Sequence, residues 1–286
     1  MPHTYAHYRF GHKCLKYMSN DIQEIVNNNI NYYLYGCQGP DIFYYYNLLK
    51  DNKVKKYGEY LHNSRVKDTL SLFEINFNKN KNRDASLSYI LGYITHFILD
   101  SYCYAYVTEA SKISDLSVDT IYKQLDEYYY LKDKINKKKF DISKKFIPSN
   151  NLVKTINSLH DNFDESIYKK IVYDYKTKLF LLNDNTSIKK EMINIFSKLT
   201  SKQKNIKSFD ENIFRKCFPF CVRCDKYFEI AAIHYKNLYK NYIDHLIKNT
   251  ELNQYFNHII NKTSSENIEI LNTKDEEEFI INKLQD

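Results

Sequence analysis

ASLSYILGYITHFILDSYCYAYV, residues 85–107, is the most apolar stretch of this chain. A membrane span needs about 18 consecutive apolar residues, and Gly92, Thr95, His96 and Asp100 interrupt this stretch. Its length and composition instead predict a buried helix at the centre of a globular fold. No other segment of the sequence comes closer to a membrane span.

The composition around this stretch indicates an all-α protein. The 286 residues include 28 Tyr and 17 Phe but only 5 Gly and 4 Pro, and no glycine follows Gly92. β-Sandwiches, barrels and nucleotide-binding α/β folds need many tight turns or glycine-rich loops, which so few Gly and Pro residues would not supply. We therefore expect a single multi-helix domain, and a chain of this length can bury a sizeable core.

Apolar spacing and turn residues divide the chain into predicted helices joined by short polar connections. The glycines and the proline of residues 36–40 predict a loop before a short aromatic helix, and Pro148 marks a later boundary. Residues 1–262 are expected to form the helical domain and residues 263–286 an acidic tail. The predicted helices cover residues 4–29, 42–50, 54–77, 85–107, 117–136, 150–160, 164–181, 186–200, 210–217 and 224–261.

The charge, the cysteines and the first residues bear on location and partners. The formal net charge of +7 is mild for this length, and six cysteines are too few for a disulfide framework. Residues 1–5 lack the basic and apolar regions of a signal peptide. We therefore expect a cytoplasmic protein with free thiols. The lysine-rich segment 132–145 is interpreted as a solvated surface, in preference to a patch for an anionic partner.

The sharpest chemical pattern lies inside the central stretch, where three residues separate His96 from Asp100. Residues i and i+4 share one face of a helix, so the imidazole and the carboxylate could bind one cation. Alone, such a pair is more often a surface ion pair or a buried, hydrogen-bonded histidine. On an apolar helix, however, a buried carboxylate is costly unless a cation or hydrogen bonds compensate its charge.

Three further candidates precede this helix, namely His7, Asp41 and His62. With His96 and Asp100 they make three histidines and two aspartates on separate elements, which is the ligand chemistry of zinc or another borderline metal. Taken singly, each would be a capping aspartate or a core histidine. Taken together, the residue types give the metal site and the structural interpretation equal weight.

Four separated motifs in the first part of the chain resemble one known family. They are MPHTYAHYRFG at residues 1–11, GPDIFYY at 39–45, Leu-His at 61–62 and GYITHFILDS at 92–101. Their order and spacing are similar to those of the zinc-dependent phospholipase C family, which is related to a group of zinc-dependent nucleases. The resemblance is clear over residues 1–130, and only helical character supports it beyond them.

The resemblance implies an all-helical fold around three zinc ions. It also implies that one carboxylate bridges two of these ions, and Asp100 stands at that position. The N-terminal residue of family members binds metal, so Pro2 becomes a further candidate ligand after removal of Met1, and the role of His3 is open. The residues that match metal ligands of the family are His7, Asp41, His62, His96 and Asp100.

The glycines fall near these matched positions. Each of the five glycines lies within five residues of a proposed ligand. Glycine has no side chain, so it permits a close approach of two backbones. We therefore expect that glycine is kept where backbones approach closely around the metal cluster, while the glycine-free remainder of the chain is free of that constraint.

The third metal site is where the chain departs from the family pattern. The resemblance would place two histidines and a glutamate, the ligands of one zinc ion, where the chain has Tyr104, Val118 and Tyr122. The loss of a whole ligand set predicts that this ion is absent and that two zinc ions remain. Asp126, which belongs to the same helix pattern, is expected to keep a structural, hydrogen-bonding role.

The activity implied by the resemblance is the hydrolysis of a phosphate ester. Metal ions would hold the phosphate oxygens and activate a water, and Asp41 is the candidate catalytic residue that orients or deprotonates this water. The family default is a phospholipid headgroup, with peripheral membrane contact. Two alternatives stay open. One is a nuclease-like phosphodiesterase, although the aromatic residues lack the basic interleaving of a nucleic-acid site. The other is a metal-binding protein that keeps the fold without turnover.

Cys217, Cys221 and Cys224 have the spacing of an iron–sulfur ligand triplet. That chemistry is usual early in an α/β barrel, whereas these residues come late in a helical chain. Cysteine is also a small hydrophobic residue that is often buried. We therefore interpret the three as core residues, in preference to a cluster or to a metal site completed by His234.

Overall fold

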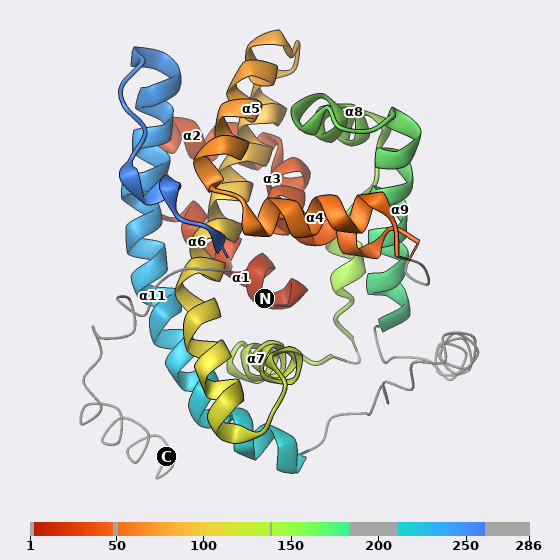
Figure 1. Cartoon of the computed structure of the whole chain (residues 1–286), viewed down its shortest axis with the longest axis vertical. Coiled ribbons are helices and arrows are strands. Elements are labelled where there is room, and N and C mark those ends of the chain that lie inside the picture. Colours follow the sequence, from red (N-terminus) through yellow and green to blue (C-terminus); the bar gives the residue numbers. More distant parts are fainter. Residues whose placement is uncertain (1–2, 48–50, 138, 183–210, 261–286) are drawn as a thin grey trace.

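The computed structural model describes residues 3–47, 51–137, 139–182 and 211–260. Within them the regular elements are helices, and the only strand-like pairing is an isolated bridge between Arg65 and Ile259. The all-α prediction is therefore confirmed, and the helices form a single domain (Figure 1). The elements are α1 (Thr4–Leu15), α2 (Asn20–Asn28), α3 (Ile30–Cys37), η1 (Gly39–Tyr45), α4 (Lys53–Asn63), α5 (Val66–Lys79), α6 (Arg83–Ser114), α7 (Val118–Lys132), η2 (Ile142–Lys145), α8 (Asn150–His160), α9 (Glu165–Leu182), α11 (Glu211–Lys248) and η3 (Gln254–Asn257).

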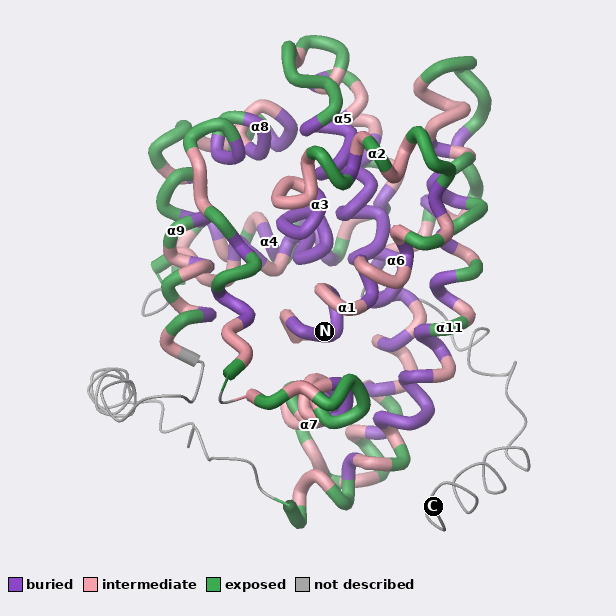
Figure 2. The backbone as a smooth tube through the Cα atoms, turned by 180° about the vertical axis from the view of Figure 1, so that it is seen from behind, coloured by how far each residue is buried: buried purple, intermediate pink, exposed green. Residues whose placement is uncertain are grey.

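Helix α6 is the centre of the fold, as its sequence predicts. Every residue from Ala85 to Ser101 is buried, because helices that include α1, α3, α5, α7 and α11 pack around it. Figure 1 shows α6 running through the middle of the molecule, and Figure 2 shows the buried backbone gathered around α3 and α6. The Asn82 side chain accepts a hydrogen bond from the Ala85 amide at 3.2 Å. This cap starts the helix just before the predicted range 85–107, and the helix continues to Ser114.

Helices α3 and α6 cross closely, and two glycines make this crossing fit. A Cβ atom on Gly36 would lie 2.1 Å from the carbonyl oxygen of Tyr89, and one on Gly92 would lie 2.2 Å from that of Tyr33. Neither position has room for a side chain. The expectation that glycine marks a close approach of backbones is confirmed here, and the crossing brings the following element, η1, against α6.

The segment after α3 differs from its prediction. The sequence predicts a loop over residues 36–40, but α3 continues to Cys37 and the 3₁₀ helix η1 starts at Gly39. The short aromatic helix predicted over residues 42–50 is present as part of this 3₁₀ helix, but it starts earlier, at Gly39, and ends at Tyr45. Gly39 has a φ of +50°, a left-handed conformation that glycine adopts at little cost and that turns the chain between the two helices.

Two predicted helices are each divided in the structure. The range 4–29 contains α1 and α2, because the backbone is extended at Ser19. The range 54–77 contains most of α4 and α5, because the backbone is extended at Ser64. Apolar spacing continues across both breaks, so periodicity alone does not reveal them. The helix predicted over residues 186–200 lies outside the described residues.

The opposite error occurs near the C-terminal end, where two predicted helices are one. The sequence predicts helices over residues 210–217 and 224–261 with a break around Pro219, but α11 is continuous and includes that proline. Buried residues such as Cys217 and Cys224 lie on both sides of the proline and on one face of the helix. Their packing outweighs the one backbone hydrogen bond that a proline removes.

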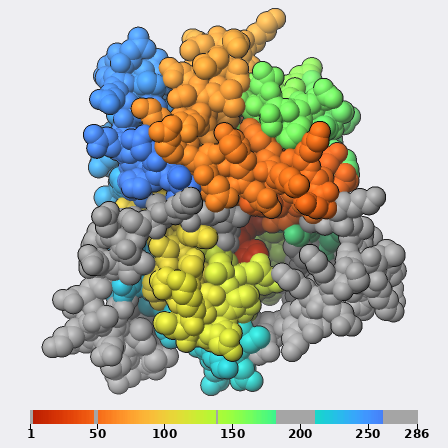
Figure 3. Space-filling model, in the orientation of Figure 1, coloured from red at the N-terminus to blue at the C-terminus, as the bar shows by residue number. Residues whose placement is uncertain are grey.

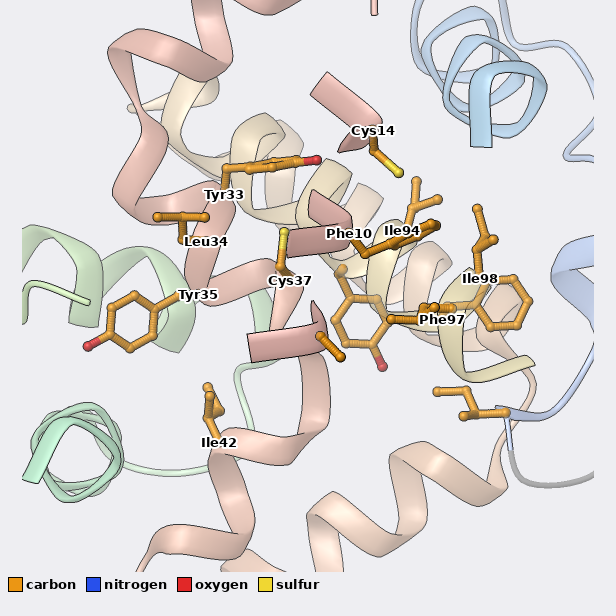
Figure 4. Packing of buried hydrophobic residues seen from close by; sticks show 14 of the residues in the cluster. Phe10, Cys14, Tyr33, Leu34, Tyr35, Cys37, Ile42, Ile94, Phe97 and Ile98 are labelled. Carbon is orange, nitrogen blue, oxygen red and sulfur yellow. The ribbon is translucent and has the colours of Figure 1, made fainter. Parts of the chain in front are cut away.

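Tyrosine supplies much of the hydrophobic core. The Tyr33 hydroxyl donates a hydrogen bond to the carbonyl oxygen of Gly11 at 2.9 Å, and the Tyr235 hydroxyl donates one to that of Leu91 at 3.4 Å. Such bonds allow a hydroxyl to be buried without a large penalty. Figure 4 shows aromatic and aliphatic side chains of α1, α3 and α6 in this core. Within the described residues, no helix has the length and apolar content to cross a bilayer.

Candidate metal centre

Four helical elements bring the five predicted ligands to one place. Helix α1 carries His7, η1 carries Asp41, α4 carries His62, and adjacent turns of α6 carry His96 and Asp100. The side chains of four of them are fully buried, and that of Asp41 is 13% exposed. We refer to these five residues as the candidate metal centre. The fold therefore gathers residues that are far apart in the chain.

The ligand atoms face one another at short distances. Oδ1 of Asp100 lies 3.4 Å from Nε2 of His7, and Oδ2 of Asp100 lies 3.2 Å from Nε2 of His96. Nε2 of His62 lies 3.3 Å from Oδ1 of Asp41 and 4.0 Å from Oδ2 of Asp100. Two tetrahedral ligands at about 2.0–2.1 Å from one zinc ion are roughly 3.3 Å apart. The observed spacing suits ligands that share cations.

Two overlapping triads are compact enough to hold a metal ion. In each triad the three ligand atoms lie within 4.8 Å of one another, and every member except the partly exposed Asp41 has a fully buried side chain. His96 belongs to both triads, so it stands between the two groups. The triads are His7, Asp41 and His96, and His62, His96 and Asp100.

The atoms that point into this centre have no hydrogen-bond partner among the described residues. A buried polar atom without a partner costs about 1–3 kcal/mol, and more if it is charged, so a cluster of them is unfavourable unless something binds there. Divalent cations would satisfy them, because imidazole nitrogen and carboxylate oxygen are zinc ligands. The unpartnered atoms are both ring nitrogens of His7, Nε2 of His62 and of His96, Oδ1 of Asp41 and both carboxylate oxygens of Asp100.

Hydrogen bonds on the far side of two imidazoles orient them toward the centre. Nδ1–H of His62 donates to the carbonyl oxygen of Gly58 at 2.8 Å, and Nδ1–H of His96 donates to that of Cys37 at 3.3 Å. A carbonyl oxygen only accepts, so Nδ1 carries the proton and Nε2 keeps a lone pair for a metal. The Tyr44 hydroxyl also lies 3.0 Å from Nδ1 of His62. Tyr44 belongs to the GPDIFYY motif, but the sequence pattern does not indicate this contact.

The neighbouring imidazoles favour the ionised form of both carboxyl groups. Burial by itself would raise the pKa of Asp100, but His96 and His7 hold that pKa well below its ordinary value. Burial opposes ionisation of Asp41 as well, and the neighbouring imidazoles of His62 and His96 leave its pKa lowered. Two carboxylates among three imidazoles therefore give the centre the negative charge that divalent cations would balance.

The residues at the predicted third metal site add no histidine or carboxylate to this cluster. Tyr122 of α7 is fully buried, and its hydroxyl has no hydrogen-bond partner in the described part of the chain. Tyr104 of α6 and Val118 at the start of α7 are half-buried. Pro2, the further candidate ligand, lies outside the described residues.

Two acidic residues of α7 support the N-terminal end of α1. Asp126 accepts hydrogen bonds from the backbone N–H groups of Tyr5 at 3.0 Å and Ala6 at 2.8 Å. These groups belong to the first turn of α1, where the helix provides no acceptor. The hydrogen-bonding role predicted for Asp126 is confirmed, and burial raises its pKa to about 6. Nε2 of His3 lies 3.4 Å from Asp119, and His3 belongs to neither triad.

The cysteine triplet belongs to α11 and lies in the hydrophobic core of the protein. Cys217, Cys221 and Cys224 are buried and unpaired. Burial raises the pKa of the Cys217 thiol to about 11, so this side chain is in its protonated form, which is a poor metal ligand. Nδ1 of His234 is 3.0 Å from the hydroxyl of Tyr102.

Comparison with known protein families agrees with this geometry. The family model described as zinc dependent phospholipase C matches residues 6–227, which is most of the chain and includes the whole candidate metal centre. A search of curated proteins and a search of solved structures found no match. The matched range, the helical fold and the zinc-type ligands lead to one conclusion: the chain belongs to the zinc-dependent phospholipase C family.

Proposed function

We propose that this protein hydrolyses phosphate esters with zinc bound by the five residues of the candidate metal centre. Its family is a zinc-dependent phospholipase C family. The observation that carries the proposal is the set of buried, unpartnered imidazole and carboxylate atoms that face one another. Zinc held by these residues would supply a Lewis acid for the phosphate oxygens and for the attacking water.

We further propose that the centre holds two zinc ions rather than three. The two compact triads support this number. Both oxygens of Asp100 are without a partner among the described residues, so each of them could hold a cation. The expected ligands of a third ion are replaced by Tyr104, Val118 and Tyr122, and tyrosine and valine side chains are not usual zinc ligands.

Asp41 has a second role in this proposal. It is the member of the candidate metal centre whose side chain reaches solvent. Despite its burial, the neighbouring imidazoles of His62 and His96 lower its pKa, so it is a carboxylate at neutral pH. A carboxylate oxygen at this position can orient a water that enters from solvent and accept its proton. We therefore assign Asp41 as the residue that positions the nucleophile.

The family supports a phosphate ester as the substrate, and a phospholipid headgroup is the specific substrate that we propose. Peripheral membrane contact follows, because such a phosphate is presented at a bilayer surface. Residues 1–262 would form the unit that binds zinc and substrate. The predicted acidic tail, residues 263–286, lies outside the described residues.

The first test measures zinc in the purified protein. We expect about two equivalents in the wild type and fewer in Asp100→Asn, because both oxygens of Asp100 face the centre. Asp84→Asn is a matched control, since it makes the same change on the same helix at an exposed position. It should leave the zinc content unchanged. A wild-type protein that binds no zinc under any condition would contradict the proposal.

Two substrates then separate the possible activities. Hydrolysis of p-nitrophenylphosphorylcholine by the zinc-loaded protein, lost in Asp100→Asn, would support a phospholipase C type of activity. Cleavage of single-stranded DNA without hydrolysis of the choline ester would instead indicate a nuclease-like phosphodiesterase. Retention of zinc with no turnover of either substrate would indicate a metal-binding protein that keeps the fold only.

A restoration experiment tests the number of ions. The triple substitution Tyr104→His, Val118→His and Tyr122→Glu should add one zinc equivalent, because it supplies the ligands that the family pattern places there. The single substitution Tyr122→Phe is the control, and it should leave the zinc content unchanged. If the triple variant binds no additional zinc, the assignment of these three positions to a lost site is wrong.

A further inference from the structure

Lys178 on α9 is a cation held against an aromatic ring near the candidate metal centre. Its Nζ atom lies 3.9 Å from the centroid of the Tyr45 ring, and Tyr45 belongs to η1, the element that carries Asp41. The Tyr45 ring is also 5.1 Å from the ring of Tyr175, which comes from the same helix as Lys178. Helix α9 packs on η1 through these contacts, so they define the position of the ammonium group.

Lys178 lies on the side of the centre that solvent can reach. Asp41 is the member of the centre with a partly exposed side chain, and it is close enough to Lys178 for an electrostatic attraction between them. Figure 3 shows a recess between α4, α7 and α9, with the red N-terminal segment visible at its floor. A small anion that approaches Asp41 from solvent therefore comes within reach of the Lys178 charge.

The surroundings of Lys178 leave its charge without an ion-pair partner within the described residues. The carboxylates of Asp119 on α7 and Asp41 on η1 attract the ammonium group, whereas Lys123 on α7 and Lys55 on α4 repel it. Burial lowers the pKa of Lys178 to about 8, so the group is protonated at neutral pH. Lys178 is only partly buried, so its ammonium group can meet an anion that enters from solvent.

We propose that Lys178 binds the phosphate group of the substrate at the open side of the candidate metal centre. This inference rests on the proposed function, because it takes a phosphate ester as the ligand. An ammonium group on a flexible stem is a point charge that pairs well with phosphate oxygens. The Tyr45 ring holds the ammonium group of Lys178 in place through a cation–π contact. Helix α9 would thus contribute to substrate binding, although it lies outside the four N-terminal motifs.

The test compares Lys178→Met with Lys178→Arg in the zinc-loaded, full-length protein. Methionine keeps most of the side-chain volume and removes the charge, whereas arginine keeps the charge. The inhibition constant of inorganic phosphate and the KM for p-nitrophenylphosphorylcholine should rise about 10- to 100-fold in Lys178→Met, as for loss of a hydrogen bond to a charged group. Lys178→Arg should stay within about threefold of the wild type. The zinc content should be the same in all three proteins.

Lys170→Met is the matched control on the same helix. Lys170 also stands over a tyrosine ring, that of Tyr46, at 5.7 Å, but it forms an ion pair with Asp174 at 2.8 Å. Its substitution should change neither phosphate binding nor KM. A pH series adds a readout that a purely structural role would not move. Phosphate affinity should fall above about pH 8 in the wild type, and this fall should move to higher pH in Lys178→Arg.

The outcomes separate this inference from the proposed function. Unchanged phosphate inhibition and unchanged KM in Lys178→Met, with zinc retained, would overturn the role of Lys178 and leave the hydrolase proposal standing. If the wild type binds zinc but does not turn over the ester, calorimetric titration with inorganic phosphate replaces the kinetic assay. Equal phosphate affinity in the wild type and Lys178→Met, or no phosphate binding by either, would then overturn the inference.

Discussion

His96 and His160 are both fully buried, yet their rings meet opposite surroundings. The His160 ring has a hydroxyl at each nitrogen, that of Tyr57 at 3.1 Å from Nδ1 and that of Tyr89 at 2.9 Å from Nε2. Nε2 of His96 has no hydrogen-bond partner among the described residues and lies 3.2 Å from a carboxylate oxygen of Asp100. The ring nitrogens of His160 therefore have hydrogen-bond partners, whereas Nε2 of His96 points into a group of atoms that lack them.

This difference shows that burial alone does not identify a functional histidine. Burial lowers the pKa of His160 to about 3, so this ring is neutral, and the aromatic rings of Phe43 and Phe73 pack against it. In the candidate metal centre the buried imidazoles instead lie beside the carboxylates of Asp41 and Asp100. Convergence of unpartnered donor atoms, rather than burial, separates a ligand site from a core residue.

The largest effect is expected when the same substitution is made at both histidines. His96 belongs to both triads, so His96→Ala should remove at least one zinc equivalent. It should lower kcat/KM by at least about 1000-fold, beyond the roughly 10- to 100-fold effect of residues that only support a ligand. His160→Ala should keep the zinc content of the wild type. Metal analysis and hydrolysis of p-nitrophenylphosphorylcholine measure the two effects. Equal loss of zinc in both variants would contradict the distinction between a ligand histidine and a core histidine.

A pH-dependent effect on stability is expected at His160. Its pKa is about 3 in the folded protein and about 6.5 in an unfolded chain. Between these values the unfolded state binds more protons, so the free energy of unfolding of the wild type falls as the pH is lowered. At pH 4 this titration lowers the free energy of unfolding of the wild type by about 3 kcal/mol relative to neutral pH. His160→Phe should not show this loss.

Urea denaturation at pH 7 and pH 4, with a chelator present, measures this difference without a contribution from bound zinc. His160→Phe should be less stable than the wild type at pH 7, because two tyrosine hydroxyls lose their partner. The gap between the two proteins should narrow or reverse at pH 4. A gap that stays constant would show that His160 does not titrate in this way.

A smaller effect is expected at Asp126, where the buried polar groups that need a partner are backbone amides rather than imidazoles. Asp126→Ala leaves the amides of Tyr5 and Ala6 without their acceptor, so the free energy of unfolding should fall by about 2 kcal/mol. Because α1 carries His7, zinc binding should weaken slightly as well. Urea denaturation and zinc titration measure both changes. A loss of stability below about 0.5 kcal/mol would mean that water replaces the carboxylate without cost.

The smallest effect is expected for Tyr44→Phe. The Tyr44 hydroxyl lies 3.0 Å from Nδ1 of His62, but the carbonyl oxygen of Gly58 accepts from the same nitrogen at 2.8 Å. The imidazole should therefore keep its orientation, and zinc affinity should fall by about 10-fold or less. Tyr46→Phe, in the same run of tyrosines, is the control. A larger loss in Tyr44→Phe would show that the hydroxyl, rather than the carbonyl, orients His62.

The N-terminal motifs predicted which residues the fold brings together. The spacing of His96 and Asp100 places them on one helical face, because α-helical geometry is local. His7, Asp41 and His62 were selected by residue type and by resemblance to the family, and the structure places all three beside that face. Periodicity failed at Ser19 and Ser64, since an apolar pattern can continue while the backbone turns. The contact of Lys178 with Tyr45 had no sequence signal.

By itself the sequence determined the helical class, the central position of residues 85–107 and the candidate ligands. These follow from composition, from local periodicity and from residue chemistry, which need no knowledge of neighbours in space. Only the tertiary structure decided which donor atoms are left without partners, that His160 is satisfied by tyrosines, and that α9 places Lys178 beside η1. These features depend on the packing of helices that are distant in the chain, and no local pattern encodes that packing.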